Sequence, residues 1–243
     1  MFLVSKKPST PKTEDKLSSR ISVIIPAYNE EDSIGLVLDA LPKERIHEII
    51  VVDNNSSDRT AKVASKRGAR VVAEKRRGYG SACLKAISAL DNPDIVVFLD
   101  GDFSDYPEEI VQLVSPIESG EVDFVLGSRM ILSDSRMALL PQSRYGNQFA
   151  VFLIRLFFRH HYTDLGPFRA IRYESLKSIE MVDTNFGWTV EMQIKAVKKK
   201  LRILELPVKY RERIGVSKIT GTFSGTIKAG IKIIYTIFKY LIT

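Results

Sequence analysis

The chain has 243 residues, 44% of them hydrophobic, and a formal net charge of +7. This length and apolar content favour one large α/β domain over two small ones. The single cysteine, Cys83, excludes an internal disulfide, and the start of the chain lacks the pattern of a signal peptide, so we expect a cytoplasmic protein. Basic residues interrupt the best apolar runs before they reach the length of about eighteen residues that crosses a membrane, so any membrane contact is expected at the surface.

The positive charge is concentrated at the two ends of the chain. Residues 1–20 contain five Lys and Arg against two acidic residues, residues 195–243 contain twelve against two, and residues 21–194 carry a net charge of −6. A basic C-terminal part is typical of proteins that meet phosphate groups, anionic lipid or nucleic acid, and it is equally consistent with a solvated surface. Residues 1–20 are rich in Lys, Ser, Thr and Pro without a sustained period, so we expect a disordered leader.

From residue 21 onward, apolar segments alternate with amphipathic ones. The expected strands are 21–25, 49–52, 70–73, 95–99 and 124–127, and the expected helices between them are 32–41, 58–67, 79–90 and 107–114. Because the strands are almost continuously apolar, both faces of their sheet are expected to be covered. The pattern therefore predicts an α/β fold with an open, mostly parallel sheet and helices on both faces.

The second half of the chain is less regular. It contains an aromatic-rich amphipathic stretch over 148–159, a strand around 168–171, a helix near 189–199 and a strand over 202–208. The last segment, 222–242, places three lysines among Ile, Tyr and Phe and predicts an amphipathic helix, which either packs on the domain or docks on an anionic membrane. We therefore expect a leader over 1–20, a domain over 21–220 and a terminal amphipathic helix over 221–243.

Polar and acidic residues follow three of the expected strands. They are Pro26-Ala27-Tyr28-Asn29-Glu30 after the first strand, Asp53-Asn54-Asn55-Ser56-Ser57-Asp58 after the second and Asp100-Gly101-Asp102 after the fourth. The carboxyl ends of parallel strands share one edge of an open sheet, where ligands bind. Two aspartates at a tight turn can reach one hard cation, so Asp100 and Asp102 predict a Mg²⁺ or Mn²⁺ site.

Two further loops are candidates for contacts with a nucleotide or a phosphate. Asp53 is placed to accept hydrogen bonds from a base or a ribose, while Asn54 and Asn55 could equally shape the turn. The basic run 75–81 carries Gly78 and Gly80 before a helix, which predicts either close backbone approach to a phosphate or sugar, or a plain turn.

Several spaced motifs resemble those of inverting family 2 glycosyltransferases: VIIPAYNEE at 23–31, IIVVDNNSSDRT at 49–60 and FLDGD at 98–102. Three more, GSR at 127–129, DLGPFR at 164–169 and RIGVSK at 213–218, are similar to the dolichyl-phosphate mannose and polyprenyl-phosphate glucose synthase branch. The resemblance implies a GT-A fold. It also implies transfer of glucose or mannose from a UDP or GDP sugar to an acceptor, first of all a polyprenyl or dolichyl phosphate at the cytoplasmic face of a membrane.

The resemblance also suggests roles for individual residues. Nucleotide-sugar binding is expected of Pro26, Ala27, Tyr28, Glu30, Asp53, Asn55, Gly80, Asp100 and Gly101, and metal binding of Asp100 and Asp102. The diphosphate or a phosphate acceptor is expected to meet Arg129, Arg211, Arg213, Ser217 and Lys218, because guanidinium groups bind phosphates well. The catalytic candidates are Asp102, Arg129, Asp164 and Glu191.

The acceptor decides whether a general base is needed. A lipid phosphate is already anionic and needs none, whereas a soluble or glycan hydroxyl acceptor would need one, for which Asp164 and Glu191 are the candidates.

Other classes of protein fit less well. A nucleotidyltransferase would carry a glycine-rich basic loop after the first strand, and a nicotinamide-dependent dehydrogenase would carry Gly-x-Gly-x-x-Gly there; the sequence has neither. A non-catalytic scaffold docked on a membrane is the remaining alternative, and it predicts that the acidic residues are dispensable. No nucleic acid partner is expected, and the oligomeric state is open.

Overall fold

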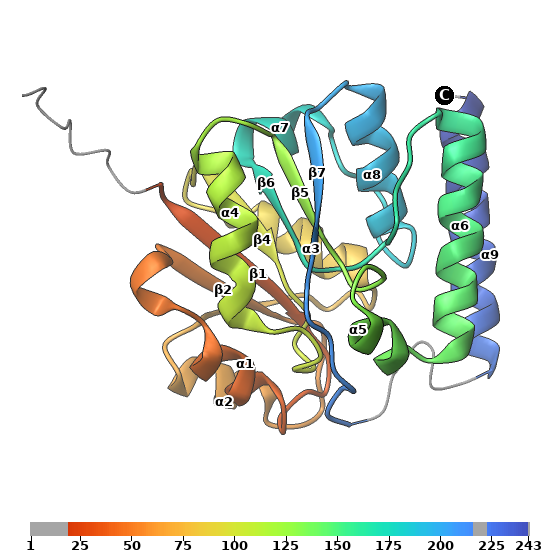
Figure 1. The fold of residues 1–243 in the computed structure, drawn as a ribbon. Helices are drawn as coiled ribbons and strands as arrows, with labels where there is room; N and C mark the ends of the chain where they lie inside the picture. The colour runs from red at the N-terminus through yellow and green to blue at the C-terminus, as the bar shows by residue number, and fades with distance from the viewer. Residues whose placement is uncertain (1–18, 216–222, 243) are drawn as a thin grey trace, which may run out of the picture.

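The computed structural model describes residues 19–215 and 223–242. In these ranges seven strands form one sheet (Figure 1). The strands are β1 (Ile21–Ala27), β2 (Glu48–Asp53), β3 (Arg70–Ala73), β4 (Ile95–Phe98), β5 (Phe124–Ser128), β6 (Arg169–Arg172) and β7 (Ile203–Pro207). Their order across the sheet is β3-β2-β1-β4-β6-β5-β7.

Helices connect most of the strands. They are α1 (Ile34–Ala40), α2 (Thr60–Lys66), α3 (Tyr79–Ile87), α4 (Ile110–Glu118), α5 (Ser133–Ala138), α6 (Pro141–Phe158), α7 (Tyr173–Ser178), α8 (Trp188–Lys198) and α9 (Phe223–Ile242), with the short 3-10 helices η1 (Lys43–Arg45) and η2 (Pro107–Glu109). Within the described ranges, each helix falls short of the length or the apolar content that crossing a membrane requires.

The sheet is mostly parallel, as the sequence predicts. β1 pairs in parallel with β2 and β4, β2 with β3, and β5 with β7, while β6 alone runs antiparallel, between β4 and β5. The expected strand at 168–171 is present one residue later, but its antiparallel place inside the sheet was not predicted. Because β6 returns to the sheet after the long excursion through α5 and α6, its partners lie far from it in the sequence.

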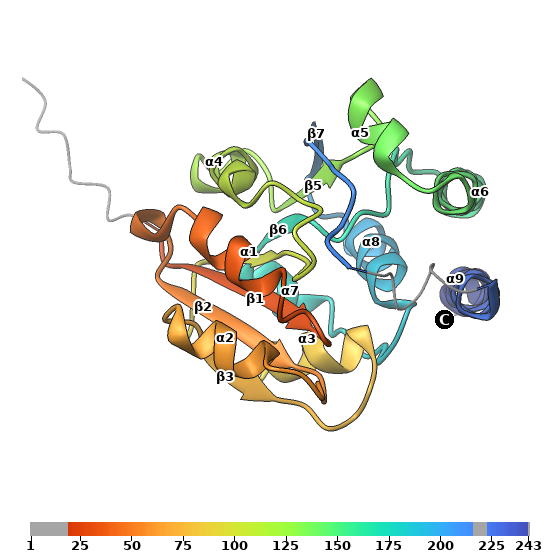
Figure 2. The ribbon, with the colours of Figure 1, turned by 90° about the horizontal axis from the view of Figure 1, so that it is seen from below.

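Both faces of the sheet are covered, which explains the continuously apolar strands. Ile24 and Phe98 face one layer of the core, where the rings of Phe98 and Trp188 lie 6.0 Å apart. Ile25 and Leu99 face the opposite layer. Figure 2 shows α1 and α4 on one side of the sheet, α3 and α8 on the other, and α9 outside α8.

The second half of the chain differs most from the sequence expectation. The amphipathic stretch expected at 148–159 is the C-terminal part of α6, which begins at Pro141; the polar residues and Gly146 in its first turns hide the apolar period. Helices α5 and α7 were not predicted, because each is only six residues long. The expected terminal helix is α9, which lies beside α6 (Figures 1 and 2). Residues 1–18 of the expected leader lie outside the described residues.

Candidate active site

A cavity of about 280 Å³ lies at the carboxyl ends of β1 and β4. From β1 the chain proceeds to β2 and β3 on one side, and then to β4 on the other, so the loops diverge at this point. Such a switch point is where open α/β sheets bind ligands. The lining residues are Pro26, Ala27, Tyr28, Glu30, Asn54, Arg77, Gly78, Tyr79, Ala82, Asp100, Gly101, Asp102, Asn185, Phe186 and Arg213.

The acidic turn after β4 brings two carboxylates to the cavity. Asp102 is only 6% exposed, and its Oδ1 accepts hydrogen bonds from the backbone N–H (3.0 Å) and the hydroxyl (2.5 Å) of Ser104. Asp100 differs, since its buried Oδ1 finds no hydrogen-bond partner among the residues that the structure describes. The turn also packs tightly, because a Cβ at Gly101 would lie 3.3 Å from the carbonyl oxygen of Pro26. Asp100 therefore has an oxygen to offer to a ligand.

The electrostatic environment of Asp100 favours its protonated form. Burial raises the pKa of Asp100 to about 7, and the neighbouring charge of Asp102 acts in the same direction. The nearby hydroxyl of Tyr79 and the positive charges of Arg213 and Arg129 act in the opposite direction and offset part of the rise in pKa. A bound cation would relieve the repulsion between the two carboxylates, so this turn is suited to binding one.

Arg213 joins the two acidic segments of the cavity. Its Nη2 lies 2.8 Å from Oε1 of Glu30, and its Nη1 lies 3.1 Å from Oδ2 of Asp102. Glu30 is 9% exposed and also accepts a hydrogen bond from the hydroxyl of Ser33. A charge removed from water needs a partner of opposite sign, so these contacts compensate the burial of both carboxylates. They hold the guanidinium of Arg213 between Glu30 and the acidic turn.

Asn54, rather than Asn55, builds the wall formed by the loop after β2. The buried amide of Asn54 donates to the carbonyl oxygens of Glu74 (3.2 Å) and Arg76 (2.7 Å), and its Oδ1 accepts from the N–H of Gly78 (2.9 Å). Asn55 is exposed and holds a left-handed backbone, with φ 65°. Three hydrogen bonds from one buried side chain therefore fix the segment 74–78 against the cavity.

Asp53 shapes the turn after β2. Its Oδ1 accepts a hydrogen bond from the N–H of Ser56 at 3.1 Å, and Asp53 is not among the residues that line the cavity. Asp53 thus takes part in shaping the turn, a role that the sequence suggested for the residues after it. Its expected contact with a base or a ribose stays a prediction.

The two glycines of the basic run admit a neighbouring loop of the protein itself. A Cβ at Gly78 would lie 2.2 Å from the carbonyl oxygen of Thr184, and a Cβ at Gly80 would lie 2.1 Å from that of Asp183. The backbone that approaches these glycines is thus the segment before α8, and Gly80 does not line the cavity. This close packing carries Asn185 into the cavity wall together with Phe186.

An arginine and a tyrosine stack at the mouth of the cavity. The guanidinium of Arg77 lies 3.1 Å from the centroid of the Tyr28 ring. Both residues line the cavity, and one face of the Tyr28 ring is covered by a cation in this structure.

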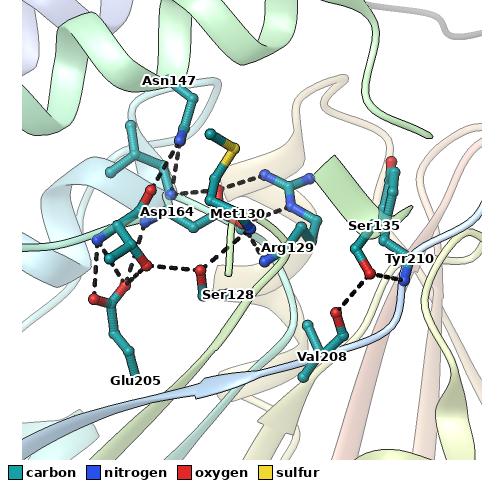
Figure 3. Close-up of polar contacts among 12 residues, drawn as sticks. Ser128, Arg129, Met130, Ser135, Asn147, Asp164, Glu205, Val208 and Tyr210 are labelled. Atoms are coloured by element: carbon teal, nitrogen blue, oxygen red, sulfur yellow. Dashed lines mark hydrogen bonds and ion pairs between the residues drawn. The ribbon is translucent and has the colours of Figure 1, made fainter. Parts of the chain in front are cut away.

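Arg129 and Asp164 form a buried ion pair beside the cavity (Figure 3). The carboxylate of Asp164, 1% exposed, accepts hydrogen bonds from Nε, Nη2 and the backbone N–H of Arg129 at 2.8 to 2.9 Å. Burial lowers the pKa of Arg129, but the pairing with Asp164 outweighs it and leaves the pKa above its usual value. Asp164 also accepts from the N–H of Leu165. Neither side chain lines the cavity, and Asp164 is saturated with donors, which is unfavourable for a general base.

Glu191 ties three segments together inside the protein. It is fully buried and accepts hydrogen bonds from the N–H groups of Val182 (3.0 Å) and Asp183 (2.6 Å) and from the hydroxyl of Tyr240 (2.6 Å). Lys195 neutralises its charge at 2.8 Å. Glu191 therefore holds the segment before α8 and the end of α9 in place, and it does not reach the cavity.

Arg211 supports the loop that follows the acidic turn. Its Nε donates to the carbonyl oxygen of Phe103 at 2.7 Å, and its guanidinium stacks on the rings of Phe103 and Tyr106. The same loop carries Asp105, a buried acid that the sequence did not single out; burial, followed by the charges of Asp100 and Asp102, raises its pKa well above the usual range.

The chain also resembles known proteins. Residues 22–180 match the family described as Glycosyl transferase family 2. The chain belongs to this family. An uncharacterized glycosyltransferase of Mycobacterium tuberculosis is 35% identical over 210 residues, covering 86% of this chain and 94% of the relative. A dolichyl-phosphate hexose transferase of Haloferax volcanii is 35% identical over 221 residues (88% and 92%), and an undecaprenyl-phosphate mannosyltransferase of Micrococcus luteus is 30% identical over 224 residues (85% and 90%).

The fold of this glycosyltransferase also matches a solved structure. It is similar to glucosyl-3-phosphoglycerate synthase from Mycobacterium tuberculosis in complex with Mn²⁺, UDP and phosphoglyceric acid, with a TM-score of 0.76 at 24% identity over 93% of this chain and 80% of that one. The likeness confirms the expected GT-A fold.

The structure gathers only part of the expected site of this glycosyltransferase at the cavity. Pro26, Ala27, Tyr28, Glu30, Asp100, Gly101, Asp102 and Arg213 line it, whereas Asp53, Asn55, Gly80, Arg129, Asp164, Glu191 and Arg211 do not. Ser217 and Lys218 lie outside the described residues, so their phosphate contacts stay predictions. Asn185 and Phe186 had no signal in the sequence, because long-range packing brings them to the wall.

The Asn54 contacts predict a contrast between two neighbouring substitutions. Asn54→Asp removes two donors and buries a charge, so we expect it to lower the free energy of unfolding by about 2 to 3 kcal/mol. Asn55→Asp, at an exposed position whose left-handed backbone Asp tolerates, should change it by less than about 0.5 kcal/mol. Urea unfolding of both variants measures the difference, and equal effects would contradict the assignment of the wall to Asn54.

The raised pKa of Asp100 predicts a pH dependence of stability. Between about pH 4 and about pH 7 the folded chain keeps a proton on Asp100 that the unfolded chain has lost, so this group's contribution is fully present near pH 4 and is lost as the pH rises through about 7. Asp100→Asn should remove this part of the slope, and the exposed control Asp134→Asn should retain it. The measurement is the free energy of unfolding of the wild type and the two variants between about pH 4 and about pH 7, in the presence of a chelator. The same dependence on pH in all three proteins would refute the prediction.

Proposed function

We propose that this glycosyltransferase moves a hexose from a nucleoside diphosphate sugar to a polyprenyl phosphate. The observation that carries the proposal is the meeting, in one cavity, of the acidic turn at Asp100 and Asp102 with the segment containing Tyr28 and Glu30. The first group suits a metal and a diphosphate, and the second suits a nucleoside. The names of the relatives from Haloferax volcanii and Micrococcus luteus support a lipid phosphate as the acceptor.

We further propose that Asp100 and Asp102 hold Mg²⁺ or Mn²⁺. Carboxylate oxygens are preferred ligands of both ions, and Oδ1 of Asp100 is buried without a hydrogen-bond partner in the described part of the chain. The same part contains no group of three His, Cys, Asp or Glu side chains placed to hold a metal, so diphosphate oxygens and water would complete the coordination. When bound, the metal supplies positive charge to the departing nucleoside diphosphate. The Mn²⁺ and UDP of the similar solved structure support this assignment.

The side chains around the metal site would hold the donor in place. Tyr28 offers an aromatic face to a nucleobase once Arg77 moves aside, and Arg77 can then meet the negative charge of the donor. Arg213, already fixed by Glu30 and Asp102, presents a guanidinium to a phosphate. Phe186 and Asn185 also line the cavity and limit its space.

The carboxylates at the cavity favour an acceptor that brings its own charge. The lining carboxylates are Glu30, Asp100 and Asp102, and each has a role in holding Arg213 or a metal. Asp164 and Glu191, the expected general bases for a hydroxyl acceptor, lie outside the lining and are paired with Arg129 and Lys195. A phosphate oxygen is anionic and can attack the anomeric carbon without a base.

A soluble acceptor is the second candidate. The similar solved structure contains phosphoglyceric acid, which is a small phosphate-bearing acid. The cationic Arg213 would suit either acceptor, so a transfer assay has to separate them.

Calorimetric titration tests the donor site. We expect UDP-glucose or GDP-mannose to bind with Mn²⁺ and to bind at least about tenfold more weakly without it, because the carboxylates and the diphosphate repel each other. Asp102→Asn should abolish the metal-dependent part, and Asp134→Asn, the same substitution at an exposed position, should leave it intact. Binding of the Asp102→Asn variant at wild-type affinity, with the fold verified by thermal unfolding, would sink the metal assignment.

A transfer assay tests the acceptor. With a hexose-labelled donor, we expect the label to move into the organic phase when a polyprenyl phosphate is present. With phosphoglyceric acid we expect the label to stay on the nucleotide, which anion-exchange chromatography of the aqueous phase measures. Neutral polyprenol is the matched control, because it has the chain without the phosphate. Transfer to phosphoglyceric acid alone would establish the soluble acceptor instead.

A further inference from the structure

Helices α6 and α9 each expose a stripe of large apolar side chains. On α6 the stripe contains Phe149, Phe152 and Leu156, which are 52%, 57% and 58% exposed. Spacings of three and four residues place such side chains on one face of a helix. The stripe on α9 has the same spacing and consists of Ile231, Tyr235 and Phe238, which are 63%, 58% and 46% exposed. We call these six residues the α6/α9 face.

The two stripes lie at the same edge of the molecule because the two helices pack together. The rings of Phe157 on α6 and Phe238 on α9 lie 5.3 Å apart. Figures 1 and 2 show the two helices side by side at one edge of the molecule. Helix α8 lies between α9 and the sheet. A continuous apolar surface of this kind on a folded chain marks a place where something else binds.

The charges on the two helices indicate what binds there. Residues 141–158 and 223–242 contain no Asp or Glu, and they carry the cations Arg144, Arg155, Lys228, Lys232 and Lys239. A surface with apolar side chains and only positive charges complements anionic lipid headgroups. A second copy of the chain fits less well, because two such faces would bring like charges together.

We propose that the α6/α9 face docks on an anionic membrane surface. The aromatic and aliphatic side chains enter the interface at the level of the headgroups, and the exposed basic side chains Arg155 and Lys228 meet the lipid phosphates. The docking surface is therefore built from two helices that lie about a third of the chain apart in sequence, and the terminal helix is only one half of it.

Helix α9 also packs on the segment that forms one wall of the cavity. Nζ of Lys232 on α9 is 2.7 Å from Oδ2 of Asp183, in the segment that carries Asn185 and Phe186. A Cβ at Gly187 would collide with the hydroxyl of Thr236, so α9 packs closely on the same segment. Docking would thus bring the cavity next to the source of a lipid phosphate. This last step rests on the proposed function, whereas the docking itself does not.

Co-sedimentation of the full chain with vesicles tests the docking. We expect binding to vesicles that contain phosphatidylglycerol and little binding to pure phosphatidylcholine. The double variant Phe152→Glu/Ile231→Glu should bind about tenfold more weakly, because it removes inserted apolar groups and adds negative charge. The control Leu36→Glu/Val111→Glu adds the same charge at exposed apolar positions on α1 and α4, 42% and 41% exposed, and it should bind like the wild type.

The proposal is wrong if the wild type does not bind anionic vesicles, or if both double variants lose vesicle binding equally. It is also wrong if sedimentation velocity shows a dimer of the wild type that Phe152→Glu/Ile231→Glu alone dissociates, while this variant still binds vesicles. Thermal unfolding of both double variants verifies their fold.

A separate transfer assay distinguishes a failure of the docking proposal from a failure of the proposed function. With a short, water-soluble polyprenyl phosphate, Phe152→Glu/Ile231→Glu should transfer hexose like the wild type, and with the acceptor in vesicles its rate should fall about tenfold. Failure of the wild type with both acceptors, with vesicle binding intact, would count against the proposed function alone.

Discussion

The ion pairs of Arg213 with Glu30 and Asp102 are the interaction on which the site depends. Arg213 and Glu30 are 183 positions apart, and their contact joins the loop after β1 to the segment after β7. Glu30 and Asp102 are both nearly buried, and buried carboxylates are costly unless a cation and hydrogen bonds compensate them. The guanidinium therefore holds the two acidic segments around one cavity. It also keeps a positive charge at the place where a donor with two phosphates is proposed to bind.

The rest of the cavity is built by backbone packing and a few buried polar side chains. Asn54 fixes the segment 74–78 with three hydrogen bonds, and Gly78 leaves room for the segment before α8 to lie against the start of α3. Glu191 holds that segment from behind through two backbone N–H groups. The side chains that shape the site are thus not the ones that touch a ligand. Glu191, a catalytic candidate in the sequence, is one of these shaping residues, and it is buried without reaching the cavity.

The two halves of the fold divide the work of the proposed reaction. The parallel strands β1, β2 and β4 supply the donor side, where the acidic turn and Tyr28 meet. We assign the acceptor side to the later helices. Helices α8 and α9 flank the segment with Phe186, and the outer side of α9 is part of the α6/α9 face. Glu191 on α8 accepts hydrogen bonds from two backbone N–H groups of that segment and from the hydroxyl of Tyr240 on α9, so it connects all three. The proposed docking surface and the cavity wall thus share α9.

The sequence by itself determined the strands of the parallel part, the acidic turn at Asp100 and Asp102, and the family. These features depend on local apolar periods and on short motifs, which one segment carries alone. Only the tertiary structure decided that β6 inserts antiparallel between β4 and β5, that Asn54 rather than Asn55 builds the wall, and that Asp164 is held by Arg129 away from the cavity. It also decided that α6 and α9 share one apolar surface. Each of these depends on contacts between residues far apart in the chain, which neither spacing nor composition encodes.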